Sequence, residues 1–428
     1  MAAVTGSHPI FPDYYYNDAA LVDSGARQAV GHWKAAAAKG LPWRARARAF
    51  ALEPVAPRIG GWTANLSGQQ RLQALGIGAI YLATGERPLL PKLLYAAAGT
   101  LGLGGIAWAG RLALGPAAGL AVLGFSAFWP THVFVTSQLF KEPLILMFAG
   151  AFLCLWFHSL GTRAPGRLLA LSAAAAAVLV PLLSLRFYLA VLLGGIAAAT
   201  WSWSAAIGSR RSWLPVISLA SALAALAAAG LLYTRYLERQ AVDSNLNPHL
   251  ACADHFIHST FQDDPPRCYH PWKPDGIAGI RRVRQRVDRL HSMQWRGREI
   301  ETQIFPDADF RTWPELVAFV PKGAFYALFM PLPGLYPMNG KVGRILAAAE
   351  NALLLALAVL AVLGLRRVRW TPAAVALLAT FLALAAGAGL LEYDLGSAAR
   401  HKLLTLSLLL PFAARALPFV DRLDEGLS

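Results

Sequence analysis

Charged side chains lie at the ends of several long apolar segments of this sequence. Lys141 and Glu142 come directly before the apolar segment 143–160, and Arg186 separates two such segments with almost no loop between them. A later segment is followed by a denser group of charges: Glu392, Asp394, Arg400, His401 and Lys402. Cations in such places suit a phosphate or diphosphate ligand, and a carboxylate suits removal of a proton from a hydroxyl group.

Each of these residues also has a simpler interpretation. A single lysine or arginine at the end of a membrane segment is commonly an anchor that reaches to the interface. Ionisable groups at such ends cost free energy unless they are paired or used. Both signs of charge gather on one face, together with the N-terminal acids Asp13, Asp18 and Asp23, and this favours a site over independent anchors.

The apolar segments identify the class of protein. The chain has 428 residues, of which 56% are hydrophobic and 15% charged, so it is too apolar for a soluble domain. Long apolar runs alternate with short basic connectors, which is the pattern of an all-α polytopic membrane protein. About nine spans are predicted, at 93–112, 115–134, 143–160, 168–184, 187–207, 214–233, 345–365, 371–391 and 402–418.

The distribution of basic residues predicts which ends of the spans face outside. If the first span runs from outside to inside, the inner loops and C-terminus carry Arg111, Arg163, Arg167, Arg210, Arg211, Arg366, Arg367, Arg369, Arg415 and Arg422. The short outer loops then carry only Lys141, Arg186, Arg400 and Lys402. Basic residues concentrate on the cytoplasmic side of membrane proteins, so this orientation is favoured and places Lys141 and Glu142 outside.

Four regions follow from these spans. Residues 1–92 form an extracytoplasmic and juxtamembrane region, and 93–233 hold six spans. Residues 234–341 form an extracytoplasmic loop that ends in a proline-rich apolar piece, 313–341, interpreted as an interfacial or re-entrant helix. Residues 342–428 hold three spans and a cytoplasmic C-terminus.

The long outer loop holds two of the three cysteines, Cys252 and Cys268. A disulfide between them is the favoured interpretation, because disulfides persist outside the cytoplasm. The same loop also offers a metal site of Cys252, His255, His258 and Cys268, which lacks the paired C-x-x-C spacing typical of zinc. The third cysteine, Cys154, lies inside a span.

The net charge of +15 does not predict nucleic-acid binding. Much of it is arginine in the inner loops, and part is a basic cluster at 281–299 in the outer loop. That cluster could meet anionic membrane lipid or an acidic glycan, or it could be a solvated helix.

Several short motifs occur in an order that resembles a known family. They are YYYNDAALVDSGARQA, with Asp18 as the acid, then IGAIYLATGERPLLPKLL, SQLFKEPLI, LRFYLA, YALFMPLPG followed by a span with Glu350, and YDLGSAARHKLL. In this order the chain resembles the GT-C superfamily of integral-membrane glycosyltransferases. That group contains the protein O-mannosyltransferases and the aminoarabinose transferase of lipid A.

The resemblance implies a fold, a reaction and a location. The fold is a GT-C-like helix bundle with a juxtamembrane helical region in the first outer loop, in the bacterial inner membrane. The donor is a sugar linked to a polyprenyl phosphate or diphosphate, and the acceptor is a glycan, lipid or protein. The active site faces the extracytoplasmic side.

The resemblance also implies roles for particular residues. Asp18 is the general base, and the sugar is transferred with inversion. Lys141, Arg186, Arg400 and Lys402 hold the leaving phosphate, with Tyr188 and Asp394 in the same motifs, and Glu142 orients Lys141 or the acceptor. No cofactor is expected, and a divalent cation is not supported, because Ala19 stands where family members carry a second acid. Family members have a span before the acidic motif, so either one lies upstream or this protein lacks it.

Two other functions are consistent with the sequence. One is an enzyme similar to an O-antigen polymerase or ligase, using the basic loop 281–298 and His291. The other is a transporter or flippase for lipid-linked sugars, which is not an enzyme. Broken helices in two symmetric halves would favour a transporter, and no internal repeat is visible.

The predicted outer loop generates the first testable prediction. Mass spectrometry of the exported protein under non-reducing conditions should find Cys252 linked to Cys268, because both lie on the oxidising side. The same sample after reduction is the control. Free thiols at both positions, or bound zinc, would contradict it.

Overall fold

The chain is described from a computed structural model. It describes residues 16–53, 55, 58–59, 62–63, 68–162, 164–207, 274–279, 281–282, 285, 302–306, 308–338, 342–418 and 420–427. At 16–18, 58–59, 62–63, 68–69, 187, 204–207, 421–422 and 427 it describes the backbone alone.

The described chain is almost entirely helical. Its helices are α2 (Tyr16–Ala38), α3 (Trp43–Leu52), α4 (Gly68–Thr84), α5 (Leu89–Leu114), α6 (Pro116–Phe128), α7 (Pro130–Thr136), α8 (Glu142–Gly161), α9 (Pro165–Ile207), α12 (Trp313–Phe329), α13 (Val342–Leu365), α14 (Pro372–Leu391), α15 (Leu395–Arg415) and α16 (Val420–Leu427). Two strands of two residues each, β1 (Arg58–Ile59) and β2 (Trp62–Thr63), pair antiparallel.

Five helices are long and apolar enough to cross a membrane. They are Leu89–Leu114, Glu142–Gly161, Pro165–Arg186, Val342–Leu365 and Pro372–Leu391. The 20 residues of α8 extend for about 30 Å, which is the thickness of the hydrocarbon core of a bilayer. Large apolar side chains such as Leu101 and Phe128 stand exposed on the outside of the bundle, as lipid contact requires. The chain is therefore a multi-pass membrane protein.

The five helices contain the predicted spans 93–112, 143–160, 168–184, 345–365 and 371–391. The prediction for 115–134 is modified, because α6 and α7 meet at Trp129 with a bend of 72°, and only the pair together is long enough to cross. The predicted span 187–207 appears as a shorter apolar helix, Tyr188–Trp203. The segment 214–233 lies outside the described residues.

Two further segments differ in extent from their predictions. The span predicted at 402–418 overlaps α15, which begins earlier, at Leu395, and ends at Arg415, so the helix carries the charged residues in its first turns. The proline-rich piece 313–341 contains the 17-residue helix α12. Five spans, or six with the bent pair, are thus supported, and nine remains a prediction.

The helix α9 turns back on itself at Arg186. The backbone of Arg186 is extended (φ −159°, ψ 84°), which interrupts the helical hydrogen bonds. At the turn, Arg186 contacts Glu142 at the start of α8. Fifteen residues later, Trp201 donates a 2.7 Å hydrogen bond to Ser159 near the end of α8. The second half of α9 therefore runs alongside α8 in the same direction, and the turn lies at the end where α8 begins.

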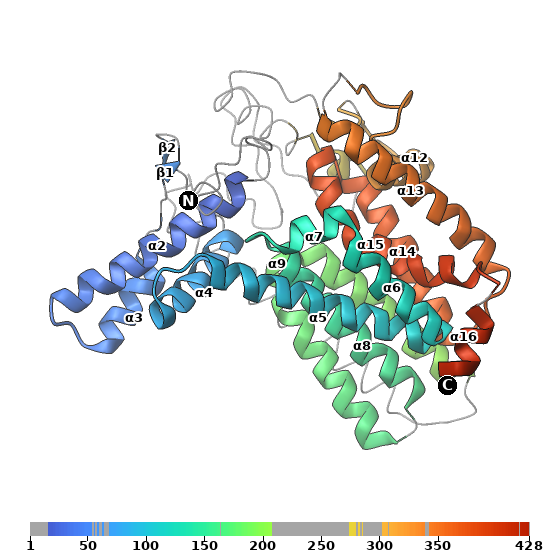
Figure 1. Cartoon of the computed structure of the whole chain (residues 1–428), viewed down its shortest axis with the longest axis horizontal. Helices are drawn as coiled ribbons and strands as arrows, with labels where there is room; N and C mark the ends of the chain where they lie inside the picture. The colour runs from blue at the N-terminus through green and yellow to red at the C-terminus, as the bar shows by residue number, and fades with distance from the viewer. Residues whose placement is uncertain are drawn as a thin grey trace.

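The bundle has two distinct ends (Figure 1). At one end α8 and α15 begin and α14 ends. At the opposite end Arg415 pairs with Asp424 at 2.6 Å, and Asp424 also accepts a 2.9 Å hydrogen bond from the backbone of Ala117 at the start of α6. That opposite end collects the described arginines of the predicted inner loops: Arg111, Arg167, Arg366, Arg367, Arg369 and Arg415.

The N-terminal helices form a separate arm. The helices α2, α3 and α4 pack on one another and project sideways from the bundle, at the end where α8 begins (Figure 1). Arg27 on α2 pairs with Asp23 at 3.0 Å and with Glu86 at 3.2 Å, and Lys34 pairs with the same Glu86 at 2.8 Å. These ion pairs fix the turn between α4 and α5, so the arm leads directly into the first span.

Glycines allow α5 and α8 to approach closely. A Cβ atom placed on Gly105 would meet the backbone of Gly150, and one placed on Gly102 would meet the backbone of Leu146. Close backbone contact through small residues is a common way for membrane helices to associate, because the hydrophobic effect does not drive helices together in lipid. Gly104, in the same helix, has open space where its Cβ would be.

This contact generates a stability prediction. Gly105→Ala should destabilise the protein by about 1–3 kcal/mol, because the new methyl group collides with backbone that cannot move aside. Gly104→Ala is the matched control and should leave stability unchanged or slightly raised, since alanine favours helix. Thermal unfolding of both variants in detergent tests this, and equal melting temperatures would contradict it.

Candidate functional site

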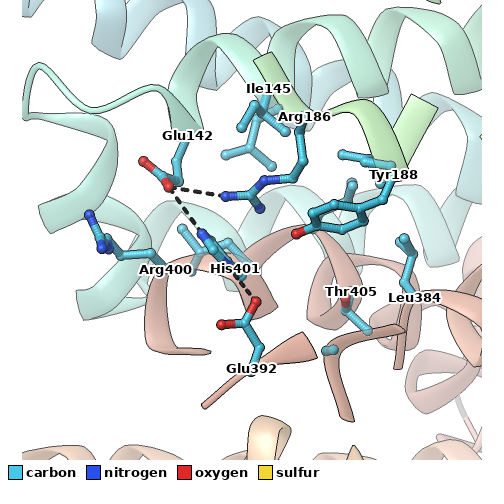
Figure 2. A pocket seen from close by; sticks show the side chains of 14 residues that line it. Glu142, Ile145, Arg186, Tyr188, Leu384, Glu392, Arg400, His401 and Thr405 are labelled. Carbon is cyan, nitrogen blue, oxygen red and sulfur yellow. Dashed lines mark hydrogen bonds and ion pairs between the residues drawn. The ribbon is translucent and has the colours of Figure 1, made fainter. Parts of the chain in front are cut away.

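A pocket opens at the end of the bundle where α8 begins. About 480 Å³ of space lies among its lining residues, and part of that space is open solvent. Part of its wall is apolar, from Ile145, Leu146, Leu189, Leu384, Leu403 and Leu404. The rest is polar or charged and includes Glu142, Arg186, Tyr188, Glu392, Arg400 and His401 (Figure 2).

The charged residues of the pocket form one continuous series of contacts. Arg186 Nη2 donates to Glu142 Oε1 at 3.4 Å, and His401 Nε2 lies 3.6 Å from the same oxygen. The other ring nitrogen of His401, Nδ1, makes a short contact with Glu392 Oε1 (Figure 2). The series Arg186–Glu142–His401–Glu392 links the turn of α9, the start of α8, the first turns of α15 and the end of α14.

These side chains are almost completely removed from solvent. The exposed fractions are 8% for Arg186, 5% for Glu142, 11% for His401 and 2% for Glu392. Buried ions are tolerated when they are paired, and removing one partner leaves the others uncompensated. The four residues therefore depend on one another.

His401 lies between two carboxylates, with Nδ1 at Glu392 and Nε2 on the side of Glu142. Arg186 and Arg400 line the same pocket, and their guanidinium groups suit an anionic ligand.

Helix ends place the acids of the site. Glu142 is the first residue of α8, where a carboxylate interacts favourably with the helix dipole, and Pro143 follows in a position that suits proline. Asp394 is the N-cap of α15 and accepts a 3.0 Å hydrogen bond from the backbone of Ser397. Glu392 follows the last residue of α14 directly.

Part of the segment predicted as the long outer loop is docked beside these helix ends. Arg281 is 1% exposed and donates to the carbonyl groups of Gly389 and Leu390, at the end of α14, at 3.4 and 3.3 Å. Ile304 donates to the carbonyl of Tyr393 at 2.7 Å, and Leu395 donates to that of Thr302 at 2.9 Å. The segments on both sides of Glu392 are therefore held by residues that lie about 90 to 110 positions earlier in the chain.

Four of the residues predicted for substrate binding line the pocket: Glu142, Arg186, Tyr188 and Arg400. The guanidinium of Arg186 lies 5.8 Å from the ring centre of Tyr188, and that of Arg400 lies 5.4 Å from the ring centre of Phe140. Such stacking fixes the plane of a guanidinium group. Lys141 precedes α8 and is not part of the pocket wall, and Asp394 is used as a helix cap.

Lys402 does not line this pocket, although it was predicted with the phosphate-holding cations. Successive helical residues point about 100° apart, so the side chains of residues 400–402 cannot all face the same way. The pocket receives Arg400 and His401, whereas Lys402 is 4% exposed and bonds to the carbonyl of Leu328 and to Asn351 on α13. Its contacts are those of a residue that holds α12 and α13 against α15.

The predicted base, Asp18, belongs to α2, and its side chain lies outside the described part of the structure. The next residues of that helix, Ala19 and Val22, are buried in a hydrophobic cluster that also contains Phe140 and Leu403. The start of α2 thus shares a core with the segments that carry Glu142 and Arg400.

Asp23, a second acid of the same helix, is used within the arm. It pairs with Arg27 and accepts a hydrogen bond from the hydroxyl of Tyr81 on α4. Burial and this hydrogen bond raise the pKa of Tyr81, and the hydrogen bond from Lys34 lowers the pKa of Glu86. Asp23 is therefore committed to holding α2 on α4.

His401 and Glu392 received no individual role from the sequence, although they belong to its group of charges. The sequence did contain a signal for this pair. His401 comes nine residues after Glu392, and a helix that starts between them can bring the histidine side chain back to the carboxylate. Cys252, Cys268, His255, His258 and His291 lie outside the described residues. Within the described part, no group of three or more His, Cys, Asp or Glu side chains is arranged to hold a metal ion.

The chain was compared with protein-family models, with curated proteins and with solved structures, and no match was found in any of the three.

The position of Lys402 generates a stability prediction. Lys402→Met should destabilise the protein by about 1–3 kcal/mol, because Asn351 Oδ1 loses its buried donor. The double variant Lys402→Met with Asn351→Leu should recover part of this loss, since Oδ1 and its donor are then both gone. Recovery should be partial, because the carbonyl of Pro331 loses the hydrogen bond from Asn351. Thermal unfolding of the two variants tests it, and a single variant as stable as the wild type would contradict the assignment.

Proposed function

We propose that this protein is a membrane glycosyltransferase of the GT-C type. It transfers a sugar from a polyprenyl-phosphate-linked donor to an acceptor hydroxyl, with inversion. The observation that carries the proposal is a pocket with two arginines and a buried acid–histidine–acid series on one side and leucines on the other, at the end of membrane-crossing helices. The order of the sequence motifs supports the same function.

The apolar and the charged residues of the pocket wall match the prenyl chain and the phosphate of such a donor. The leucines offer an apolar surface to the prenyl chain. Arg186 and Arg400 offer guanidinium groups to the phosphate, and guanidinium binds phosphate through paired hydrogen bonds. In a buried pocket these cations also stabilise the charge that collects on the phosphate as it leaves.

The proposed reaction uses Asp18 as the general base. Asp18 takes the proton of the acceptor hydroxyl while that oxygen attacks the anomeric carbon, and the bond from this carbon to the phosphate oxygen breaks on the opposite side. The bonding electrons leave with the polyprenyl phosphate, which Arg186 and Arg400 hold. The position of α2, with its start in the same hydrophobic cluster as Phe140 and Leu403, supports this role.

The pocket end is proposed to face the extracytoplasmic side of the bacterial inner membrane. The support is the concentration of arginines at the opposite end of the bundle, since such residues favour the cytoplasmic side. Nine spans in all are proposed, including the segment 214–233. The donor sugar would then be used after it has reached the outer leaflet.

Two substitutions separate chemistry from donor binding. Asp18→Asn should lower transfer by roughly 10²-fold or more, the usual scale for loss of a general base, and leave donor binding intact. Arg400→Ala should weaken donor binding as well as turnover, because a cation facing a phosphate acts in both the ground and transition states. Both are measured on purified protein in liposomes with a panel of polyprenyl-phosphate sugars.

Arg369→Ala is the matched control, because it removes an exposed arginine at the opposite end of the bundle and should change neither quantity. Full transfer by a well-folded Asp18→Asn variant would contradict the base assignment. Movement of the lipid-linked sugar across the bilayer without transfer would support a transporter instead.

A further inference from the structure

The two carboxylate oxygens of Glu142 have different surroundings. Oε1 is shared by Arg186 and His401. Oε2 is buried and has no hydrogen-bond partner among the residues that the structure describes. In Figure 2 this second oxygen points away from Arg186 and His401.

A buried carboxylate oxygen without a donor is unfavourable, and native proteins rarely leave one. Rotation of the Glu142 carboxylate does not give Oε2 a donor, because Oε1 is held by Arg186 and His401 on two different helices. It is also adjacent to positive charge, so it is ionised and accepts hydrogen bonds only. Glu142 lines the pocket and Oε2 is covered, so a ligand that displaces the side chains over this oxygen can supply the missing donor.

We propose that Glu142 Oε2 accepts a hydrogen bond from a hydroxyl group of the donor sugar. Glu142 is then the residue that distinguishes a phosphate carrying a sugar from a phosphate alone. The inference rests on the proposed function, since it assigns a role within the same pocket. His401 acts as a positioning residue, because it contacts Oε1 and so fixes the direction of Oε2. Glu392 acts through His401, whose ring it holds.

The charges in the pocket explain why a hydrogen bond to Glu142 would favour the sugar-bearing lipid over a bare lipid phosphate. Arg186 and Arg400 attract any lipid phosphate, including the sugar-free polyprenyl phosphate that remains after transfer. Glu142 lies in the same pocket and repels that phosphate by its charge, without any compensating bond. A sugar hydroxyl beside the phosphate supplies the compensation, so the sugar-bearing lipid is preferred over the product.

The experiment compares two probes, polyprenyl phosphate and a polyprenyl-phosphate-linked hexose, by direct binding to protein in nanodiscs. The wild type should bind the hexose-linked lipid about 10–100-fold more tightly, the range expected for a hydrogen bond to a charged group. In Glu142→Gln this preference should fall to near unity, and the bare lipid phosphate should bind as well as before or better. Arg369→Ala should keep the wild-type preference.

Several outcomes would overturn the inference. They are equal binding of both probes by the wild type, retention of the preference by Glu142→Gln, or no binding of either probe. The wild-type comparison needs no variant, so it stands even if Glu142→Gln fails to fold. A third probe, bearing a hexosamine with a free amine, overturns the hydroxyl assignment if the wild type prefers it and Glu142→Gln does not.

The inference and the proposed function can fail separately. Transfer by a wild-type protein that shows no preference between the probes would leave the function standing and remove the inference. A preference that depends on Glu142, in a protein that transfers no sugar, would keep the inference and remove the function.

Discussion

One carboxylate oxygen, Oε1 of Glu142, joins the parts of this site. It receives Arg186 from the turn of α9 and His401 from α15, and through His401 it is connected to Glu392 at the end of α14. The turn of α9 has no loop residues to adjust its position, because the helix resumes directly after Arg186. The pocket therefore exists only while four helix ends stay aligned, and buried ion pairs with mutual dependence supply that alignment.

The sequence predicted the helices well and the site in part. Apolar runs identify a membrane helix because the bilayer demands them, so five of the nine predicted spans coincide with long apolar helices. The adjacency of Arg186 to a turn, and of Glu142 to a helix start, could also be deduced, since both lie where an apolar run stops. The structure separates Lys402 from Arg400 and His401, which the sequence placed in one group. Helix periodicity alone would have separated Lys402 from Arg400, once α15 was known to begin before them.

Other features depend on contacts between distant segments, which a single sequence does not reveal. The capping of α14 by Arg281 and the pairing of residues 302–304 with 393–395 belong to this class. Arg281 had been included in a basic cluster that could meet lipid or glycan, and instead it is buried against backbone carbonyls. A charge pattern predicts that cations are present, but burial decides whether they face a ligand, the solvent or the protein itself.

The glycine contacts of α5 determine where a hydrocarbon chain has room to pass between helices. Between α5 and α8 the two backbones touch, so a hydrocarbon chain has no room to pass there. The seam between α9 and α14 is different, because a Cβ atom placed on Gly387 would meet only a terminal methyl group of Leu192, at 3.9 Å. Side chains swing aside far more easily than backbones, and this seam leads to Leu189 and Leu384 in the pocket wall. Of these two seams, the one between α9 and α14 is therefore the one that movement of side chains alone could widen.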